Sequence, residues 1–273
     1  MKAIFLTLAL AAFSSQVCAS EPLLIVSKGK IERIMPFSSK LVASRYLDVW
    51  LPPGYSSKQK YDVLYMHDGR MLFDANTTWN KQEWRVDEVA GTLIEQNKVR
   101  PFIVVSIPNA GENRHSEFFP QRPFESLAEP HQALLYQLER SENVVLFNSQ
   151  VYSDNYLKFI VTEVIPYIES NYSVNVGGAH RYLAGSSMGG LISWYGLIQY
   201  PNEFAGAICM STHWPGIFAD DPLVFNAFKG YIEKYLPILS SQKIYFDYGI
   251  DLYSPATAFG STALAHQGIS SAG

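Results

Sequence analysis

Apolar runs of strand length alternate along this chain with segments whose apolar residues recur at helical spacing. The strand-like runs cover residues 41–51, 63–66, 102–107, 205–210 and 244–248. Between the second and third runs, Val86, Val89, Ala90, Leu93 and Ile94 fall at i, i+3, i+4, i+7 and i+8, which predicts a helix with one apolar stripe. Strands that alternate with such helices are typical of a mostly parallel sheet. The pattern therefore predicts a doubly wound α/β fold.

A second helix is predicted over residues 157–168, where apolar residues repeat at the same spacing. Ser153 or Asp154 stands where a side chain would cap the first turn of this helix. Pro166 lies inside the pattern, and we expect it to kink the helix or end it early, because proline lacks an amide proton.

The segment 109–154 separates the strand at 102–107 from this helix and shows no strand pattern of its own. Because it is too long for a bare loop in a compact domain, we expect it to carry a helix at His131–Leu138 and to form a cap over a site. The predicted organisation is one domain over residues 21–273, with this cap-like insertion and an atypical tail over residues 254–273.

The start of the chain, Met1–Ser20, has the features of a signal peptide. Lys2 supplies the positive start, and the apolar stretch Ala3–Phe13 is shorter than the ~20 residues that a membrane-spanning helix needs. A buried helix at the start of the chain is the alternative. Cleavage near Ser20 would leave Cys209 as the single cysteine, which excludes an intrachain disulfide. We therefore expect a secreted or periplasmic protein whose mature chain does not insert into a membrane.

The composition narrows the class of protein further. Of the 273 residues, 48% are hydrophobic and 17% are charged, which excludes disorder for most of the chain. The formal net charge is −4 and Lys and Arg form no run, so we expect no nucleic-acid partner. The sequence has neither His-x-x-x-His nor Cys-x-x-Cys spacing, so we expect no metal and no cofactor.

The segment Gly185-Ser186-Ser187-Met188-Gly189 matches the pattern Gly-x-Ser-x-Gly, with Ser187 at its centre. A strand-like segment precedes it, and the nearly all-apolar segment Leu191–Tyr200 that follows is typical of a buried helix. The chain turns sharply from strand to helix at such a serine, so the flanking positions must lack a Cβ that would clash. Ser187 is the predicted nucleophile, and the backbone amide of Met188 is a predicted oxyanion donor. A tight turn with a purely structural role is the alternative.

Several further segments, together with this motif, resemble an esterase family of the α/β-hydrolase superfamily. This group contains enterochelin esterases, S-formylglutathione hydrolases, feruloyl esterases and mycolyltransferases. The segments that carry the resemblance are 48–54, 63–74, 109–115, 211–216 and 244–249. The resemblance implies an α/β-hydrolase fold and a small-molecule ester as substrate. It also implies that the amide of Arg70, just after Asp68-Gly69, is the second oxyanion donor, with an ordinary Asp-Gly turn as the alternative.

The other members of a catalytic triad should follow the serine in the order acid, then histidine. Asp251 is the first carboxylate after the strand-like run 244–248, and Asp251-Leu252-Tyr253 resembles a shortened form of the family's acid segment. Asp251 is therefore the predicted acid, and Asp247, inside the strand, is the weaker choice. The tail does not resemble the family's ending. We expect the family's last strand, its helix and the catalytic histidine to be missing from the sequence as given, with His266 as the alternative base.

The remaining histidines and aromatic residues suggest surroundings for the site. We expect His67 to line its floor and His213 to shape its pocket, and we expect His115, His131 and His180 on the surface or in loops. Part of an aromatic set should form an apolar, aryl or sugar pocket: Trp79, Trp84, Phe118, Phe119, Phe124 and Trp214.

The function predicted from these features is that of an exported serine carboxylic-ester hydrolase, acting through an acyl-enzyme on Ser187. One alternative is a non-catalytic or truncated protein of this fold that binds a ligand without turnover. Another is an acyltransferase of the same fold, in which an alcohol replaces water as the acceptor.

Overall fold

The computed structural model describes residues 24–239 and 241–247. The predicted signal peptide, the acid candidate Asp251, the alternative base His266 and the tail at 254–273 lie outside the described residues. Within the two described ranges, no helix combines the length and the apolar character needed to cross a membrane.

A seven-stranded sheet forms the centre of the fold, with the strand order β1-β2-β4-β3-β7-β8-β9. Its strands are β1 (Lys30–Phe37), β2 (Arg45–Leu51), β3 (Asp62–His67), β4 (Phe102–Ile107), β7 (Arg181–Ser186), β8 (Gly206–Met210) and β9 (Lys243–Phe246). β2 pairs with β1 and β4 in antiparallel orientation, whereas the pairings from β4 across to β9 are parallel. The mostly parallel sheet is thereby confirmed. The sequence pattern does not predict β1, because this edge strand is largely exposed and has no buried apolar run.

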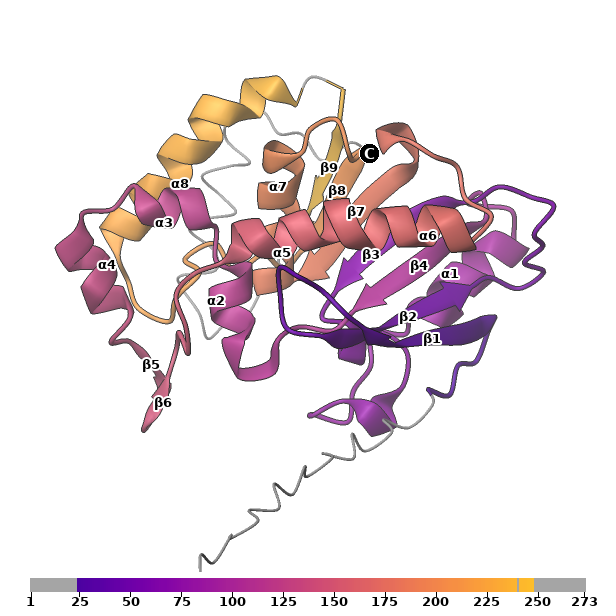
Figure 1. Cartoon of the computed structure of the whole chain (residues 1–273), viewed down its shortest axis with the longest axis horizontal. Coiled ribbons are helices and arrows are strands. Elements are labelled where there is room, and N and C mark those ends of the chain that lie inside the picture. The colour runs from indigo at the N-terminus through magenta and orange to yellow at the C-terminus, as the bar shows by residue number, and fades with distance from the viewer. Residues whose placement is uncertain (1–23, 240, 248–273) are drawn as a thin grey trace, which may run out of the picture.

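Successive side chains of a strand point to opposite faces of the sheet, and each face has its own cover. α1 (Val86–Glu95) lies on one face, where Ala90 and Ile94 pack in a cluster with Met66 of β3. The other face is covered by α7 (Met188–Gln199), α8 (Pro222–Tyr235) and a long helical run that crosses in front of the sheet in Figure 1. Helices on both faces confirm the doubly wound α/β fold.

The long helical run consists of α5 (Ser153–Phe159), the π-helical turn η4 (Ile160–Val164) and α6 (Ile165–Asn171). It confirms the second predicted helix but does not end at Pro166, which is the second residue of α6 and lies in its first turn. A proline is tolerated in a first turn, so the run continues. The expected cap is wrong as well. Tyr152 precedes α5 without a side-chain cap, and the Ser153 hydroxyl instead accepts a hydrogen bond from the amide of Gln121 at 3.0 Å.

The segment 109–154 folds into short elements that lie at one end of the sheet, on the left of Figure 1. They are η3 (Gly111–Asn113), α2 (Arg114–Phe118), α3 (Gln121–Glu125), α4 (Glu129–Leu135), β5 (Glu139–Ser141) and β6 (Val144–Val145). α4 confirms a helix in this segment, but it begins two residues earlier and ends three residues earlier than the predicted His131–Leu138. The β5–β6 hairpin corrects the expectation of no strand, because two such short exposed strands carry no apolar run. A buried ion pair between Arg45 of β2 and Glu117 of α2, at 2.6 Å, ties the insertion to the sheet.

Short 3₁₀ turns connect several elements: η1 (Gly69–Met71), η2 (Ala75–Thr77), η5 (Gly178–His180) and η6 (Leu236–Ile238).

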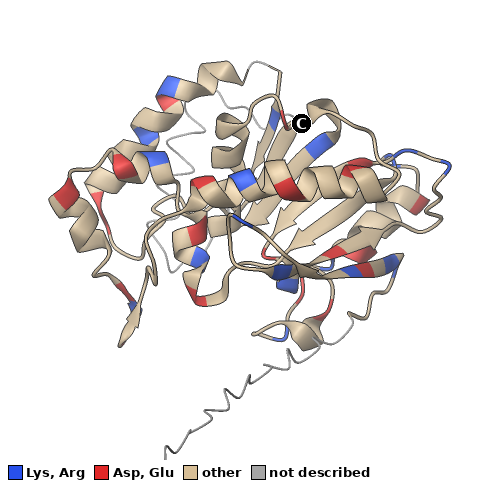
Figure 2. Ribbon diagram, viewed as in Figure 1, with Lys and Arg blue, Asp and Glu red and all other residues tan. Residues whose placement is uncertain are grey.

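Figure 2 shows acidic and basic residues interspersed along the helices and loops around the sheet. One ion-paired group anchors a central strand. Arg181, the first residue of β7, pairs with Glu169 of α6 at 2.6 Å and with Glu203 at 2.5 Å.

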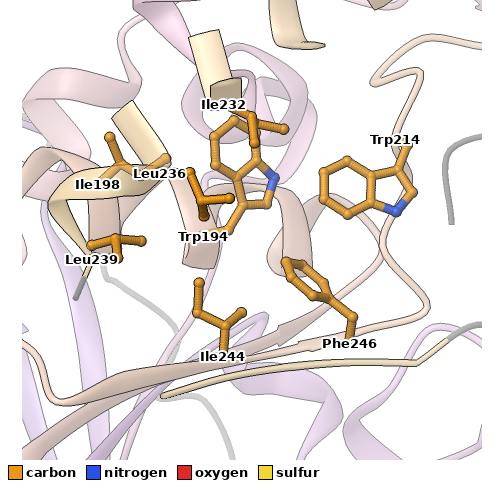
Figure 3. A pocket seen from close by; sticks show the side chains of 8 residues that line it. All are labelled: Trp194, Ile198, Trp214, Ile232, Leu236, Leu239, Ile244 and Phe246. Carbon is orange, nitrogen blue, oxygen red and sulfur yellow. The ribbon is translucent and has the colours of Figure 1, made fainter. Parts of the chain in front are cut away.

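An apolar cluster joins α7, α8 and β9 (Figure 3). Trp194 of α7 stacks on Trp214 with ring centroids 6.0 Å apart, and Trp214 lies 5.3 Å from the ring of Phe246 on β9. Ile232 of α8 and Ile244 of β9 complete the contact between the helices and the strand. This cluster holds the last described strand beside β8.

Candidate functional site

Ser187 lies at the junction where β7 ends and α7 begins. Its backbone has φ 58° and ψ −118°, a conformation that costs energy for a residue with a side chain. Hydrogen bonds hold it there: its amide donates to the carbonyl of Met210 at 2.9 Å, and its carbonyl accepts from the amides of Leu191 at 3.1 Å and His213 at 3.2 Å. The strained serine is therefore fixed against the turn that follows β8.

The glycines around Ser187 lie where neighbouring backbone or side-chain atoms leave no room for a Cβ. A Cβ on Gly185 would lie 2.5 Å from the carbonyl carbon of Gly189, and a Cβ on Gly190 would lie 2.7 Å from Oγ1 of Thr212. The strand and the helix of this turn thus approach each other as the Gly-x-Ser-x-Gly pattern predicts. Met188 is the first residue of α7, where backbone amides have no acceptor within the helix.

The turn after β3 touches the serine turn. β3 and β7 are parallel neighbours, with Met66 paired to Ala184, so both turns lie at the same edge of the sheet. A Cβ on Gly189 would lie 3.0 Å from Oδ2 of Asp68 and 3.5 Å from Cβ of His67. The candidate oxyanion amides of Met188 and Arg70 therefore belong to two turns in direct contact.

Arg70 lies in η1, and its side chain points toward the ring of Tyr46, with Cζ 5.7 Å from the ring centroid. The preceding glycine permits this turn to sit close to β4. A Cβ on Gly69 would lie 2.4 Å from Oγ of Ser106, and that hydroxyl donates a hydrogen bond to the Gly69 carbonyl at 3.1 Å. The backbone of η1 is thus held to β4.

His67 packs against the serine turn, with its Cβ 3.5 Å from where a Cβ on Gly189 would stand. It is fully buried, and its Nδ1 is 2.8 Å from the hydroxyl of Tyr156. Burial lowers the pKa of His67 to about 4, so the ring is neutral at neutral pH.

Asp68 and Arg114 form an ion pair where the turn after β3 contacts the turn that contains Ser187. Arg114 Nε and Nη2 donate to Oδ1 and Oδ2 of Asp68 at 2.6 and 2.7 Å, and the Asn109 amide adds a bond to Oδ1 at 2.7 Å. Burial by itself would raise the pKa of Asp68, but the charge and hydrogen bonds of Arg114 outweigh it and lower the pKa below its ordinary value. The sequence places Asp68-Gly69 and residues 109–115 in separate segments and does not predict that they pair.

The prediction that His115 lies on the surface or in a loop is wrong. It belongs to α2 and is 4% exposed, and burial together with the charge of Arg114 lowers its pKa to about 3. Its ring lies 5.6 Å from that of Phe218, which in turn lies 5.2 Å from the ring of His213. A cavity of about 280 Å³ adjoins this group, lined by His115, Arg140 and residues of the β5–β6 hairpin. His213 does not line this cavity; its amide donates a hydrogen bond to the carbonyl of Ser187 at 3.2 Å, and its role in shaping a pocket stays a prediction.

The aromatic residues expected to supply a pocket are mostly core residues. Phe118 and Phe119 are fully buried, Phe124 is 3% exposed, and Trp79 is 85% exposed. None of the six lines the cavity beside His115. The sequence does not distinguish core residues from pocket residues in this set, because both environments favour apolar side chains.

Asp247 does not lie inside a strand, contrary to the sequence interpretation, but directly after β9. Its Oδ1 accepts a hydrogen bond from the amide of Ser211 at 2.6 Å. Ser211 follows β8, whose last residue accepts the Ser187 amide, so Asp247 supports the turn on which the candidate nucleophile rests. Among the described residues, no group of three or more His, Cys, Asp or Glu side chains is arranged to hold a metal ion, and Cys209 is buried and free.

The family model described as "Putative esterase" matches residues 38–228. The chain belongs to this esterase family. YbbA of Bacillus subtilis is 27% identical over 168 residues, which are 61% of this chain and 56% of YbbA. An endo-1,4-beta-xylanase/feruloyl esterase of Xylanibacter ruminicola is 25% identical over 227 residues, which are 78% of this chain and 26% of that protein.

The chain thus spans about half of the length of YbbA and a quarter of the xylanase/feruloyl esterase. Among solved structures, the BES protein from Bacillus cereus superimposes with a TM-score of 0.61 at 18% identity. The match covers 90% of this chain and 85% of that protein. This likeness confirms the α/β-hydrolase fold.

Proposed function

We propose that this esterase-family chain is an exported serine carboxylic-ester hydrolase that acts through an acyl-enzyme on Ser187. The observation that carries the proposal is the strained backbone of Ser187 between a parallel strand and the amino end of α7. This placement presents the hydroxyl beside backbone amides at a helix N-terminus, where developing negative charge is favoured. Family membership and the feruloyl esterase relative support an ester as the substrate.

In this mechanism, Ser187 Oγ attacks the ester carbonyl, and the amides of Met188 and Arg70 hold the oxyanion. A base takes the Oγ proton and returns it to the leaving alcohol, and water, deprotonated by the same base, then releases the acid from the acyl-enzyme and restores the serine hydroxyl. Serine depends on an adjacent base. Asp251 is the proposed acid that would orient this base, and His266 is the alternative base within the sequence as given.

The test compares Ser187→Ala with Ser186→Ala, a matched control because Ser186 is the neighbouring serine at the end of β7. With p-nitrophenyl acetate and methyl ferulate as substrates, Ser187→Ala should reduce kcat by roughly 10³-fold or more, and Ser186→Ala should keep most activity. A fluorophosphonate probe followed by peptide mass spectrometry should label Ser187. Full activity in Ser187→Ala, or labelling of a different residue, contradicts the proposal.

The same experiment separates the alternatives. If the chain neither hydrolyses these esters nor reacts with the probe but still binds an aryl ester, it is a binding protein of this fold. If added alcohol diverts the acyl group into a new ester faster than water does, it is an acyltransferase. Export is tested by mass spectrometry of protein from envelope or culture fractions, which should begin at Ser20 or Glu21.

A further inference from the structure

We propose that Asp68 and Arg114 are positioning residues. They connect the two turns whose amides would donate to the oxyanion, and they keep the contact between these turns electrically neutral. This inference rests on the proposed function. The pair belongs to two elements far apart in the sequence: Asp68 follows β3, and Arg114 begins α2 of the insertion. Neither residue is assigned a contact with the substrate.

The carboxylate of Asp68 forms the contact between the turns. Asp68 has φ 57° and ψ 42°, a left-handed conformation that aims the chain from β3 into η1. Its Oδ2 occupies the space next to Gly189, 3.0 Å from where a Cβ would stand. The position of η1 relative to the first turn of α7 therefore depends on where this carboxylate is held.

Arg114 and Asn109 hold the carboxylate in one orientation. The fork of Arg114 bonds both carboxylate oxygens, at 2.6 and 2.7 Å, which fixes its plane as well as its position. Arg114 also lies over the ring of Phe118, with Cζ 5.3 Å from the ring centroid. The side chain of Asp68 is 3% exposed and that of Arg114 23% exposed, so water screens this pair weakly.

The charge of the pair matters as much as its geometry. A buried carboxylate beside the amides that stabilise an oxyanion would repel the developing negative charge, and the guanidinium of Arg114 cancels that repulsion. Removal of Arg114 alone leaves the carboxylate unpaired. Removal of both charges leaves a neutral junction, so the double variant should be the better catalyst, the reverse of what additive damage would produce.

The experiment measures kcat and KM of Arg114→Gln, Asp68→Asn and the double variant with p-nitrophenyl acetate. Arg114→Gln should lower kcat by about 10²-fold with KM nearly unchanged, because one misplaced oxyanion donor has an effect of this size. The double variant should have a kcat at least about tenfold higher than that of Arg114→Gln. A phenylboronic acid, which forms a tetrahedral adduct on the serine, should lose affinity in parallel with kcat.

The matched control is a second ion pair with the same fork, Arg33 on β1 with Asp48 on β2, at 2.7 and 2.8 Å. Arg33→Gln should lower stability but not kcat. If Arg114→Gln fails to fold, Arg114→Lys serves instead and should lower kcat by about tenfold, because it keeps the charge and loses the fork.

Three results overturn the inference: no effect of Arg114→Gln on kcat, a double variant no more active than Arg114→Gln, or an equal loss of kcat in Arg33→Gln. Fluorophosphonate labelling of Ser187 in the unchanged chain tests the proposed function independently of this inference. Labelling of Ser187 with no effect of Arg114→Gln refutes this inference alone, whereas loss of the Ser187 assignment refutes the proposed function.

Discussion

The backbones of Gly185 and Gly189 are in such close contact that a Cβ on Gly185 would lie 2.5 Å from both the carbonyl carbon and the oxygen of Gly189. We therefore expect Gly185→Ala to displace the serine turn. It should destabilise the protein by about 1–3 kcal/mol, the usual cost of overpacking. It should also lower kcat by more than the loss of folded protein accounts for. Urea unfolding and kcat with p-nitrophenyl acetate measure the two effects.

Gly230→Ala is the control for this prediction. Gly230 lies on the exposed side of α8, and a Cβ there would meet no atom within 4 Å. Alanine in a helix is favoured over glycine by roughly 0.5–1 kcal/mol, so this change should stabilise the protein and leave kcat unchanged. If the two substitutions have the same effect, the contact between the strand and the helix does not constrain the turn.

Stability should decrease as the pH falls below about 6.5, because two buried histidines stay neutral in the folded chain. Burial lowers the pKa of His67 to about 4 and that of His115 to about 3, whereas both residues bind a proton below about pH 6.5 in the unfolded chain. The unfolded state thus holds more protons in this window, and acid favours it. Each histidine should contribute up to about 1.4 kcal/mol per pH unit.

Urea unfolding at a series of pH values between about 7 and 5 measures this slope. His115→Gln removes one of these titrating groups and should reduce the slope, while His67 and His213, whose pKa is also lowered by burial, maintain the rest. Asp68 acts in the same direction as the histidines but at lower pH: its pKa is lowered in the folded chain, so the stability from its pairing with Arg114 is lost only as the pH falls below the ordinary carboxyl pKa, outside this window. A slope that is the same in His115→Gln and in the unchanged chain would contradict the assignment to His115.

The two faces of β9 should differ in their contribution to stability. Phe246 is half-buried and packs against Trp214, whereas its neighbour Tyr245 points to the other face of the sheet and is 49% exposed. Phe246→Ala should lower the free energy of unfolding by about 2 kcal/mol, and Tyr245→Ala by about 0.5 kcal/mol or less. Equal effects in denaturant unfolding would show that the cluster in Figure 3 does not fasten β9.

The features that the sequence predicts correctly are those decided within a few residues. The spacing around Ser187 is such a feature, because a sharp turn excludes a Cβ at its own flanking positions. The apolar periods that give α1 and the strands of the parallel sheet are also local. The same argument fails for β1 and for the β5–β6 hairpin, since exposed strands carry no apolar run to mark them.

Tertiary structure decided which polar groups became buried and paired. Asp68 and Arg114 are 46 residues apart, and nothing in either segment specifies the other; they meet because β3 ends where α2 begins its first turn. His115 follows Arg114, and its burial depends on contacts with Phe147 and Phe218. The apolar pattern of a chain reports the face that each element buries, but a buried charge is stable only beside the partner that the packing supplies.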